Sequence, residues 1–397
     1  MSPHTTPTRR RFLSALGASA ANLPLITTPG FLQAAGQEPG NGKILILLEL
    51  AGGNDGLNTV VPVTDPGYRA LRPTIGIEQR SALQLDQDTA LHPAMAAMAK
   101  LWEEGALRII EGVGYPNPNR SHFRSIEIWN AGFGAESAER KGWISTSFSD
   151  GAPVATHASG LSLGGGMGPL RGPGRFSALD NEESFLEALE NMQKPGHAVR
   201  PDSSSPLAHV LGAYESAKIT GDGISKRLEQ RASRSFDFPE TEIGDQLRTV
   251  ARLLEAGVDV SVMKVIQTGY DTHDNQPDQH SFLLGDLSDA IGAFARAIKT
   301  IGLWERVTLV TYSEFGRTAR ENGSAGTDHG TAAPVFAVGG RVAGGFDGKR
   351  VSLEKLHEGD LVHTTDYRDL YSAILSDLWD IHGPSFRPTP GAEIRLL

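Results

Sequence analysis

The chain has 397 residues, no cysteine and a formal net charge of −10. Its 39% hydrophobic and 21% charged residues are typical of a globular protein. The acidic balance makes nucleic acid and anionic membrane surfaces poor partners. Without cysteine there is no disulfide, so the folded chain depends on its core or on a bound metal. Beyond the N-terminal region, no stretch is apolar for the length that spans a bilayer.

The first residues have the three regions of an export signal in order. Arginines occupy positions 9–11 ahead of a Phe-Leu pair, an uncharged and mildly apolar run extends to Ile26, and small residues follow at 34–36. An arginine pair in this position is typical of the twin-arginine class, whose cargo leaves the cytoplasm already folded. We therefore expect residues 1–36 to be a signal peptide and the twin-arginine translocase to be a partner during export. The mature protein is expected to be periplasmic or extracellular, without stable membrane insertion.

Aliphatic runs alternate with amphipathic ones along the rest of the chain. The first run, 43–50, is almost continuously aliphatic, as strands buried on both faces are. In chain order the pattern predicts a strand at 43–50, a helix at 92–102, a strand at 107–113, a helix opening at 121–129, a helix at 241–256, a strand at 258–267, a helix at 279–301, strands at 307–312 and 334–338, and a helix at 367–380. This order predicts an α/β fold, a three-layer sandwich with a mostly parallel central sheet and helices on both faces.

One segment departs from this pattern. Residues 132–206 are rich in Gly, Ser and Pro and only weakly periodic. We interpret them as an insertion with little regular structure beyond a helix near 182–192. Residues 37–397 are therefore expected to form a single α/β domain that carries this insertion.

Polar clusters follow the predicted strands, always at the end of a strand. They are Asn54 and Asp55; Ser121 and His122; Asp271, His273, Asp274 and His280; Ser313, Glu314 and Arg317; and Asp328 and His329. The carboxyl ends of parallel strands meet at one edge of a sheet, where ligands bind. Carboxylates and imidazoles gathered there would repel and desolvate one another unless a cation holds them. Oxygen and nitrogen ligands without thiolate suit zinc, manganese, magnesium or calcium.

Each cluster alone also has an ordinary explanation. Asp55 lies in a Gly-Asn-Asp-Gly segment and can be a turn residue. Ser121 can cap a helix with His122 as a first-turn residue, and His280 can be a solvent-facing residue that opens its helix. The joint placement at strand ends, with no cluster at a strand start, favours a divalent-metal site.

Five motifs add a resemblance to this pattern. They are LLELAGGNDGLNT at 47–59, GYDTHDNQ at 269–276, SEFGRT at 313–318, TDHG at 327–330 and TDYRDLY at 365–371. Together they resemble the motifs of exported proteins grouped as the domain-of-unknown-function 1501 family, over nearly the whole mature chain. That family is similar in fold to the alkaline phosphatase and sulfatase superfamily, and its members often carry a twin-arginine signal. The resemblance implies an alkaline-phosphatase-like fold.

The superfamily pattern implies metal ligands at matching positions. These are Asp55, Asp271, His273, Glu314, Asp328 and His329. Phe315 departs from the pattern, because the superfamily normally has an imidazole after the acid that Glu314 matches. One divalent ion, or two with altered ligands, is compatible with this change.

The same pattern implies the catalytic group. Ser121 matches the nucleophile at a helix start, with Ser125 in reserve and His122 beside it. Arg317 or Arg124 would clamp the anionic oxygens of the substrate. Such a site supports phosphoryl or sulfuryl transfer, so the resemblance implies a metal-dependent hydrolase of an anionic ester on a small molecule or glycan.

Two further points bound the function. An ordinary sulfatase needs a Cys or Ser followed by Pro two residues later and Arg two after that, and no such sequence is present. The Phe315 change also leaves open a non-catalytic protein that binds a metal or a glycan on the same fold.

Overall fold

The computed structural model describes most of the chain after residue 41. The described residues are 42–149, 155, 157–179, 221, 224–228, 234–382, 389 and 394–397, all within the unit Gly40–Leu397. The predicted signal peptide and the predicted helix near 182–192 lie outside them. Among the described helices, none combines the length and apolarity needed to cross a membrane.

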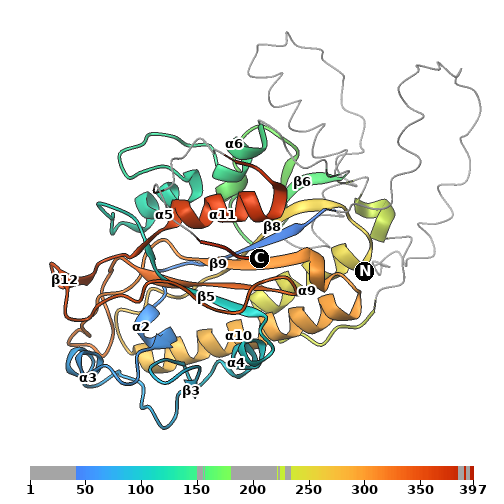
Figure 1. Ribbon diagram of the computed structural model, residues 1–397. Coiled ribbons are helices and arrows are strands. Elements are labelled where there is room, and N and C mark those ends of the chain that lie inside the picture. Colours follow the sequence, from blue (N-terminus) through green and yellow to red (C-terminus); the bar gives the residue numbers. More distant parts are fainter. Residues whose placement is uncertain are drawn as a thin grey trace, which may run out of the picture. The chain divides into compact units, whose positions relative to one another are not determined.

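A nine-stranded sheet forms the centre of the described part (Figure 1). Its strands are β1 (Ile44–Leu50), β5 (Leu107–Gly114), β6 (Ala158–Leu163), β7 (Phe176–Leu179), β8 (Val260–Gln267), β9 (Val307–Tyr312), β10 (Ala333–Gly339), β11 (Gly345–Gly348) and β14 (Thr365–Asp366). The order is β11-β5-β10-β9-β1-β8-β6-β7, and β14 pairs with β5. Strand β10 is antiparallel to β5 and β9, while the other described pairings of this sheet are parallel. The predicted mostly parallel sheet is confirmed.

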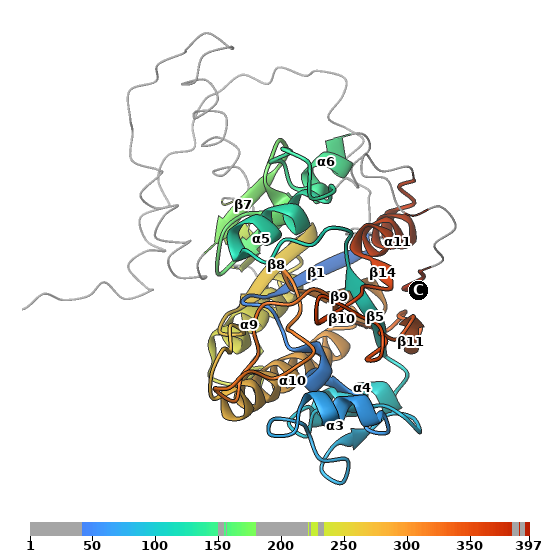
Figure 2. The same ribbon diagram turned by 90° about the vertical axis from the view of Figure 1, so that its left-hand side faces the viewer.

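Helices cover both faces of this sheet. They are α4 (Ala96–Glu103), α9 (Glu242–Glu255) and α10 (Gln276–Thr300) on one face, and α5 (His122–Ala131), α6 (Trp143–Ser149) and α11 (Tyr367–Trp379) on the other. Figures 1 and 2 show these two groups on opposite sides of the strands. The three layers predicted from the alternation of aliphatic and amphipathic segments are therefore present.

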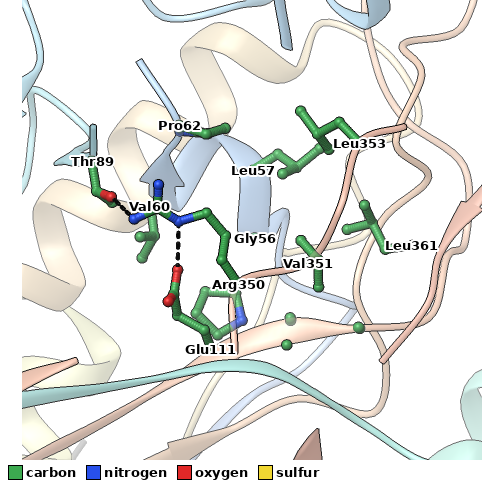
Figure 3. Close-up of a pocket in the computed structure, with 14 residues that line it drawn as sticks. Gly56, Leu57, Val60, Pro62, Thr89, Glu111, Arg350, Val351, Leu353 and Leu361 are labelled. Atoms are coloured by element: carbon green, nitrogen blue, oxygen red, sulfur yellow. Dashed lines mark hydrogen bonds and ion pairs between the residues drawn. The ribbon is translucent and has the colours of Figure 1, made fainter. Parts of the chain in front are cut away.

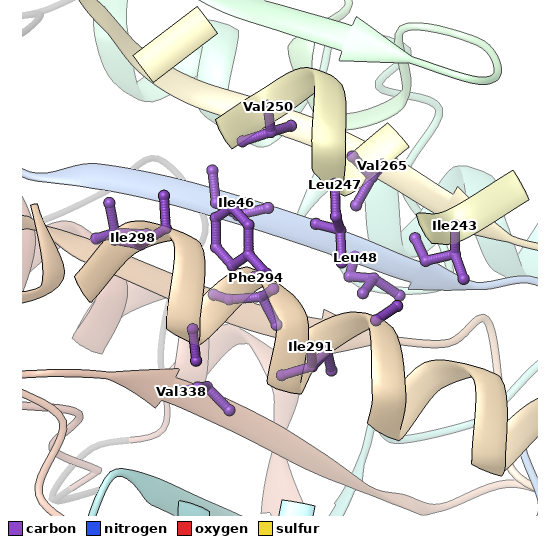
Figure 4. Close-up of a cluster of buried hydrophobic side chains, with 14 of the residues drawn as sticks. Ile46, Leu48, Ile243, Leu247, Val250, Val265, Ile291, Phe294, Ile298 and Val338 are labelled. Carbon is purple, nitrogen blue, oxygen red and sulfur yellow. The ribbon is translucent and has the colours of Figure 1, made fainter. Parts of the chain in front are cut away.

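Strand β1 explains why the sheet needs both layers. All seven of its residues are buried, and successive side chains of a strand point to opposite faces. Ile46 and Leu48 pack into the core under α9 and α10, among residues such as Leu247 and Phe294 (Figure 4). Leu45 packs into the second core, under α5 and α11.

Shorter elements complete the described part. They are α2 (Gly56–Thr59), β2 (Val60–Val61), α3 (Pro66–Leu71), β3 (Leu83–Gln84), β4 (Ala90–Leu91), the 3-10 turns Gly168–Leu170 and Trp304–Arg306, and the hairpin of β12 (Leu356–His357) and β13 (Asp360–Leu361). Strands β2, β4 and β3 form a small separate sheet in that order.

The segment 132–206 corrects one prediction. Its described residues include α6 and the strands β6 and β7, so the expectation of little regular structure was wrong there. Strand β6 reads Ala-Ser-Gly-Leu-Ser-Leu, and its Ser and Gly residues hid the aliphatic pattern of a buried strand. It nevertheless pairs with β8 and buries Leu161 and Leu163 completely or nearly so.

Candidate functional site

Loops at the carboxyl ends of the strands bring three histidines and one aspartate together. His122 opens α5, Asp271 and His273 follow β8, and His329 lies in the loop before β10. Ligand atoms of His122, Asp271 and His329 all lie within 4.8 Å of one another. The Nε2 atom of His273 lies 3.0 Å from Asp271 Oδ1 and 2.9 Å from His329 Nε2.

The outer nitrogen, Nδ1, of each histidine is held by an acceptor oxygen. The pairs are His122 with Glu314 Oε1 at 2.9 Å, His273 with Asp328 Oδ1 at 3.1 Å, and His329 with the carbonyl oxygen of Arg120 at 2.8 Å. Carbonyls and ionised carboxylates only accept, so each Nδ1 donates its proton and each neutral ring presents a lone pair at Nε2. Metal-binding histidines show this same arrangement, in which an outer partner fixes the tautomer and the orientation of the ring.

A metal ion or a proton shared by the two rings explains the 2.9 Å approach of the His273 and His329 Nε2 atoms. With both Nδ1 atoms protonated, two neutral rings would point lone pairs at each other. A metal ion can bind both Nε2 lone pairs and the Asp271 carboxylate at once, whereas a proton can bridge only the two nitrogen atoms. Tetrahedral zinc, with ligands at about 2.0–2.1 Å, separates its ligand atoms by about 3.3 Å. Separations of 2.9, 3.0 and 3.4 Å among these residues bracket that value, so the donor set fits a metal ion.

Asp271 is oriented and kept ionised by Arg317. The Arg317 Nη2 atom donates to Asp271 Oδ1 at 2.7 Å. Partial burial disfavours the charged carboxylate, but the charge and the hydrogen bond of Arg317 outweigh this effect and hold the pKa of Asp271 below its ordinary value. The carboxylate is therefore available as a ligand at neutral pH.

The side chain of Phe315 forms the floor under two of the histidines. Its ring centroid lies 4.9 Å from that of His122 and 4.8 Å from that of His329. Gly53 makes room for it, since a Cβ atom there would lie 2.4 Å from Phe315 Cε2. Phe315 thus has a structural role at the position where the sequence lost an imidazole: it supports the rings of the candidate ligands.

The group is open to solvent. Asp271 and His273 are 45% and 43% exposed, His122 is 33% exposed and His329 is 24% exposed. A substrate can therefore reach the histidines from outside.

A separate, small pocket lies between α2 and the strands β5 and β10. Figure 3 shows its polar wall, where Arg350 contacts Glu111 and Thr89, facing an apolar wall with Leu57 and Leu353. His122, Asp271, His273 and His329 do not line this pocket. Because these four side chains are 24–45% exposed, the candidate site is a cluster at the surface.

Asp55 does not join this group, which corrects the prediction that it is a metal ligand. It is 1% exposed and pairs with the guanidinium of Arg72 through Oδ2, which also accepts from Gln276. Its Oδ1 atom accepts from the main-chain nitrogens of residues 57 and 58 at the start of α2. Burial disfavours its charge, but Arg72 outweighs this and lowers the pKa of Asp55. Both oxygens are occupied within the protein.

Arg317 and Arg124 direct most of their donors to groups of the protein, which argues against the prediction that either one clamps a substrate anion. The side chain of Arg317 is fully buried, and it donates to the carbonyl oxygens of Gly53, Tyr270 and Thr327 as well as to Asp271. Arg124 donates to Glu127 and to the carbonyl oxygens of residues 135 and 137. Arg317 acts on the site through Asp271, as a positioning residue.

The two candidate nucleophiles differ in their surroundings. Ser121 is exposed at the N-cap of α5 and its side chain makes no capping hydrogen bond. Ser125 is buried, and its hydroxyl bonds to the Tyr115 hydroxyl and to the carbonyl oxygen of Glu314. Ser125 therefore belongs to the core, and the prediction for Ser121 remains.

For three other residues the structure indicates a different role from the predicted one. Glu314 is 4% exposed and accepts from Gly52 N at 2.8 Å as well as binding His122, so it lies behind the ligands. Asp328 holds His273 from outside in the same way. His280 is 1% exposed and bonds Asn54 through Nε2 at 2.9 Å, so it does not face solvent.

Sequence reasoning did not identify Arg120, whose only signal is its position directly before Ser121 and His122.

Comparisons with known proteins agree with the family resemblance. Residues 211–395 match the family described as "Protein of unknown function (DUF1501)". No curated protein matches the sequence. The chain is similar to the crystal structure of Ps i-CgsB in complex with k-i-k-neocarrahexaose, with 10% identity over 86% of this chain and 73% of that chain and a TM-score of 0.43.

Two other solved structures are similar at the same level. A protein in the alkaline phosphatase superfamily from Vibrio parahaemolyticus gives 11% identity over 86% of this chain and 67% of that one, with a TM-score of 0.37. The sulfatase PsFucS1 from Pseudoalteromonas sp. gives 10% identity over 88% and 70%, with a TM-score of 0.39. Scores at this level transfer neither an activity nor a ligand to this chain.

Proposed function

Residues 211–395 belong to the DUF1501 family, and from this premise we propose that the chain is an exported metal-dependent hydrolase of an anionic ester. The substrate is a phosphate or sulfate ester of a small molecule or glycan. One observation carries the proposal: the Nε2 atoms of His273 and His329 approach to 2.9 Å beside Asp271, although the Nδ1 atom of each ring already binds an acceptor.

In this proposal His122, Asp271 and His329 bind one divalent ion, and His273 adjoins them, with its Nε2 atom 3.0 Å from Asp271 Oδ1. Two imidazoles with one carboxylate favour zinc over magnesium and calcium, which prefer oxygen ligands. Bound there, the ion would lower the pKa of a water or serine hydroxyl and neutralise charge on the transferring group. Ser121 adjoins His122 and has an exposed hydroxyl that is not used as a helix cap, which supports it as the nucleophile. Phe315 and Arg317 hold the ligands in place.

Metal analysis of the purified protein tests this proposal. We expect about one zinc per chain, and we expect His122→Ala, His273→Ala and His329→Ala each to lower zinc affinity by at least tenfold. His382→Ala, an exposed histidine beyond the end of α11, serves as the control and should leave zinc affinity unchanged. Activity is then measured on a phosphomonoester, a phosphodiester and a sulfate ester. A folded protein that binds no divalent ion and cleaves none of the three would contradict the proposal.

A second function, metal binding without turnover, is favoured by one observation. Both arginines expected to clamp an anion, Arg317 and Arg124, donate to carbonyl oxygens of the protein. The variant Ser121→Ala separates the two functions. An enzyme should keep its zinc and lose at least a hundredfold in kcat, whereas a binding protein has no turnover to lose and is stabilised thermally by its ligand.

A further inference from the structure

The hydrolase proposed above needs a cationic group that receives the anionic end of its substrate. Arg317 is fully buried, and Arg124 directs its Nη2 atom to two carbonyl oxygens, so both are poorly placed for this role. Arg120 differs from both. Its side chain is 43% exposed, and its one ion pair among the described residues is with Asp360.

Arg120 is attached to the candidate site through its main chain. Its carbonyl oxygen accepts from His329 Nδ1 at 2.8 Å, and it directly precedes Ser121 and His122. Its main chain therefore links the candidate nucleophile to one of the candidate ligands. Its side chain does not take part in holding the ring of His329.

Asp360 pairs with the guanidinium of Arg120 but engages only one of its nitrogen atoms. The Nη2 atom of Arg120 lies 2.5 Å from Asp360 Oδ2, but neither carboxylate oxygen has an aligned hydrogen-bond partner in the described residues. Asp360 itself is 2% exposed. The carboxylate therefore engages one end of the guanidinium, while 43% of the Arg120 side chain stays exposed.

The support under Asp360 is firm. It lies in β13, directly after the tight turn at Glu358 and Gly359, both of which have positive φ. The neighbouring Leu361 accepts from the hydroxyl of Thr331, two residues after His329. The residue that restrains Arg120 is thus tied to the same loop that carries a candidate ligand.

We propose that Arg120 binds the tetrahedral oxyanion of the substrate, with Asp360 as the positioning residue for its guanidinium. Arginine suits this role because its planar fork of N–H donors matches two oxygens of a phosphoryl or sulfuryl group. The inference rests on the proposed hydrolase function and names the group that recognises the anion.

Oxyanion binding tests this inference without relying on turnover. Inorganic phosphate and inorganic sulfate are titrated separately into the zinc-loaded full-length protein at fixed ionic strength. Arg120→Gln should weaken binding of the preferred anion by at least tenfold, and Arg120→Lys should weaken it less because the charge remains. Zinc affinity should stay within threefold of the wild type, because the substitution keeps the carbonyl that holds His329. Arg248→Gln, which changes a surface arginine paired with Asp245 on α9, is the matched control and should change neither value.

Asp360→Asn separates positioning from folding. It keeps the shape of the side chain and removes its charge, so we expect the KM for a cleaved ester to rise more than kcat falls, with the thermal midpoint nearly unchanged. The anion that binds more tightly, phosphate or sulfate, identifies the ester class.

The outcomes that overturn each proposal are distinct. Phosphate and sulfate affinities of Arg120→Gln equal to those of the wild type, or no oxyanion binding by the wild type, would overturn the role of Arg120. Absence of zinc binding would instead overturn the metal centre. In that case the same titrations on the metal-free protein still compare the wild type with Arg120→Gln.

Discussion

Arg317 donates from Nη2 to Asp271 Oδ1 at 2.7 Å while three main-chain carbonyls hold the rest of its guanidinium. The arginine is fully buried and the aspartate is 45% exposed, so a group anchored in the core sets the position of a carboxylate at the surface. A partner of this kind, one step outside the ligands, commonly contributes tenfold to a hundredfold to metal affinity. The relation between these two residues links the fold to the candidate metal centre.

Replacing Arg317 by Lys should weaken zinc binding by about tenfold to a hundredfold. A lysine cannot donate to three separate carbonyls in this plane, so we also expect a loss of about 1–3 kcal/mol in the free energy of unfolding. Zinc affinity is measured by competition with a chelator, and stability by urea denaturation. Arg248→Lys on the surface of α9 is the control. Unchanged zinc affinity in a folded Arg317→Lys protein would show that Asp271 does not depend on Arg317.

The variant Asp55→Asn should destabilise the protein and leave zinc stoichiometry unchanged. Asp55 neutralises the fully buried Arg72, and an unpaired buried charge costs about 3–5 kcal/mol. The double variant Asp55→Asn/Arg72→Gln removes both charges and should recover part of this loss. Urea denaturation and metal analysis at saturating zinc provide the two measurements. Loss of the ion from a folded Asp55→Asn protein would restore Asp55 as a ligand.

Gly53→Ala should disturb the floor of the site. Gly53 has φ +85°, and an added Cβ atom would lie 2.4 Å from the Phe315 ring. We expect a loss of about 1–3 kcal/mol in stability, because both the backbone conformation and the contact become strained. Trimming the ring in Gly53→Ala/Phe315→Leu should recover the part caused by the contact. A double-mutant cycle measured by urea denaturation isolates that part, and additive single effects would exclude the contact.

The sequence predicted the part of the site that depends on strand direction. Asp271, His273, Asp328 and His329 all follow or precede strands of the sheet, and the end at which they meet could be inferred from the aliphatic runs. The role of each atom could not be inferred. Whether a residue is a ligand or holds one depends on which ring nitrogen faces inward, and that is set by partners far away in the chain, such as Glu314 for His122.

Asp55 shows the same limit for a motif residue. Its Gly-rich turn was recognised, but its partner Arg72 lies 17 residues later and outside every motif. Strand β6 also escaped detection, because Gly160 and Ser162 are buried where the strand pairs with β8 but are not themselves strongly apolar. Long-range pairing decided both cases, and local sequence patterns carry little information about it.

Stability should fall as the pH drops below about 6.5, because two buried histidines stay neutral in the folded protein. His92 and His280 are 4% and 1% exposed, with ring centroids 6.0 Å apart. Burial lowers the pKa of His92 to about 4 and that of His280 to about 3. Both histidines take up protons near pH 6.5 in the unfolded chain. The destabilisation caused by these two histidines is therefore absent above the unfolded pKa. As the pH falls from 6.5 towards 4, each histidine lowers the free energy of unfolding by about 1.4 kcal/mol per pH unit.

The variant His92→Asn tests whether His92 lowers stability as the pH falls. The amide oxygen can still accept from the main-chain nitrogen of Ala94, which His92 Nδ1 binds at 3.1 Å, but the variant cannot take up a proton. The free energy of unfolding is measured by urea denaturation at several values between pH 7.5 and 4.5. We expect the difference between variant and wild type to shift in favour of the variant by about 1.4 kcal/mol per unit below pH 6.5. Carboxylates contribute equally to both proteins and cancel in this difference. A difference that stays constant with pH would mean that His92 is protonated equally in the folded and unfolded states.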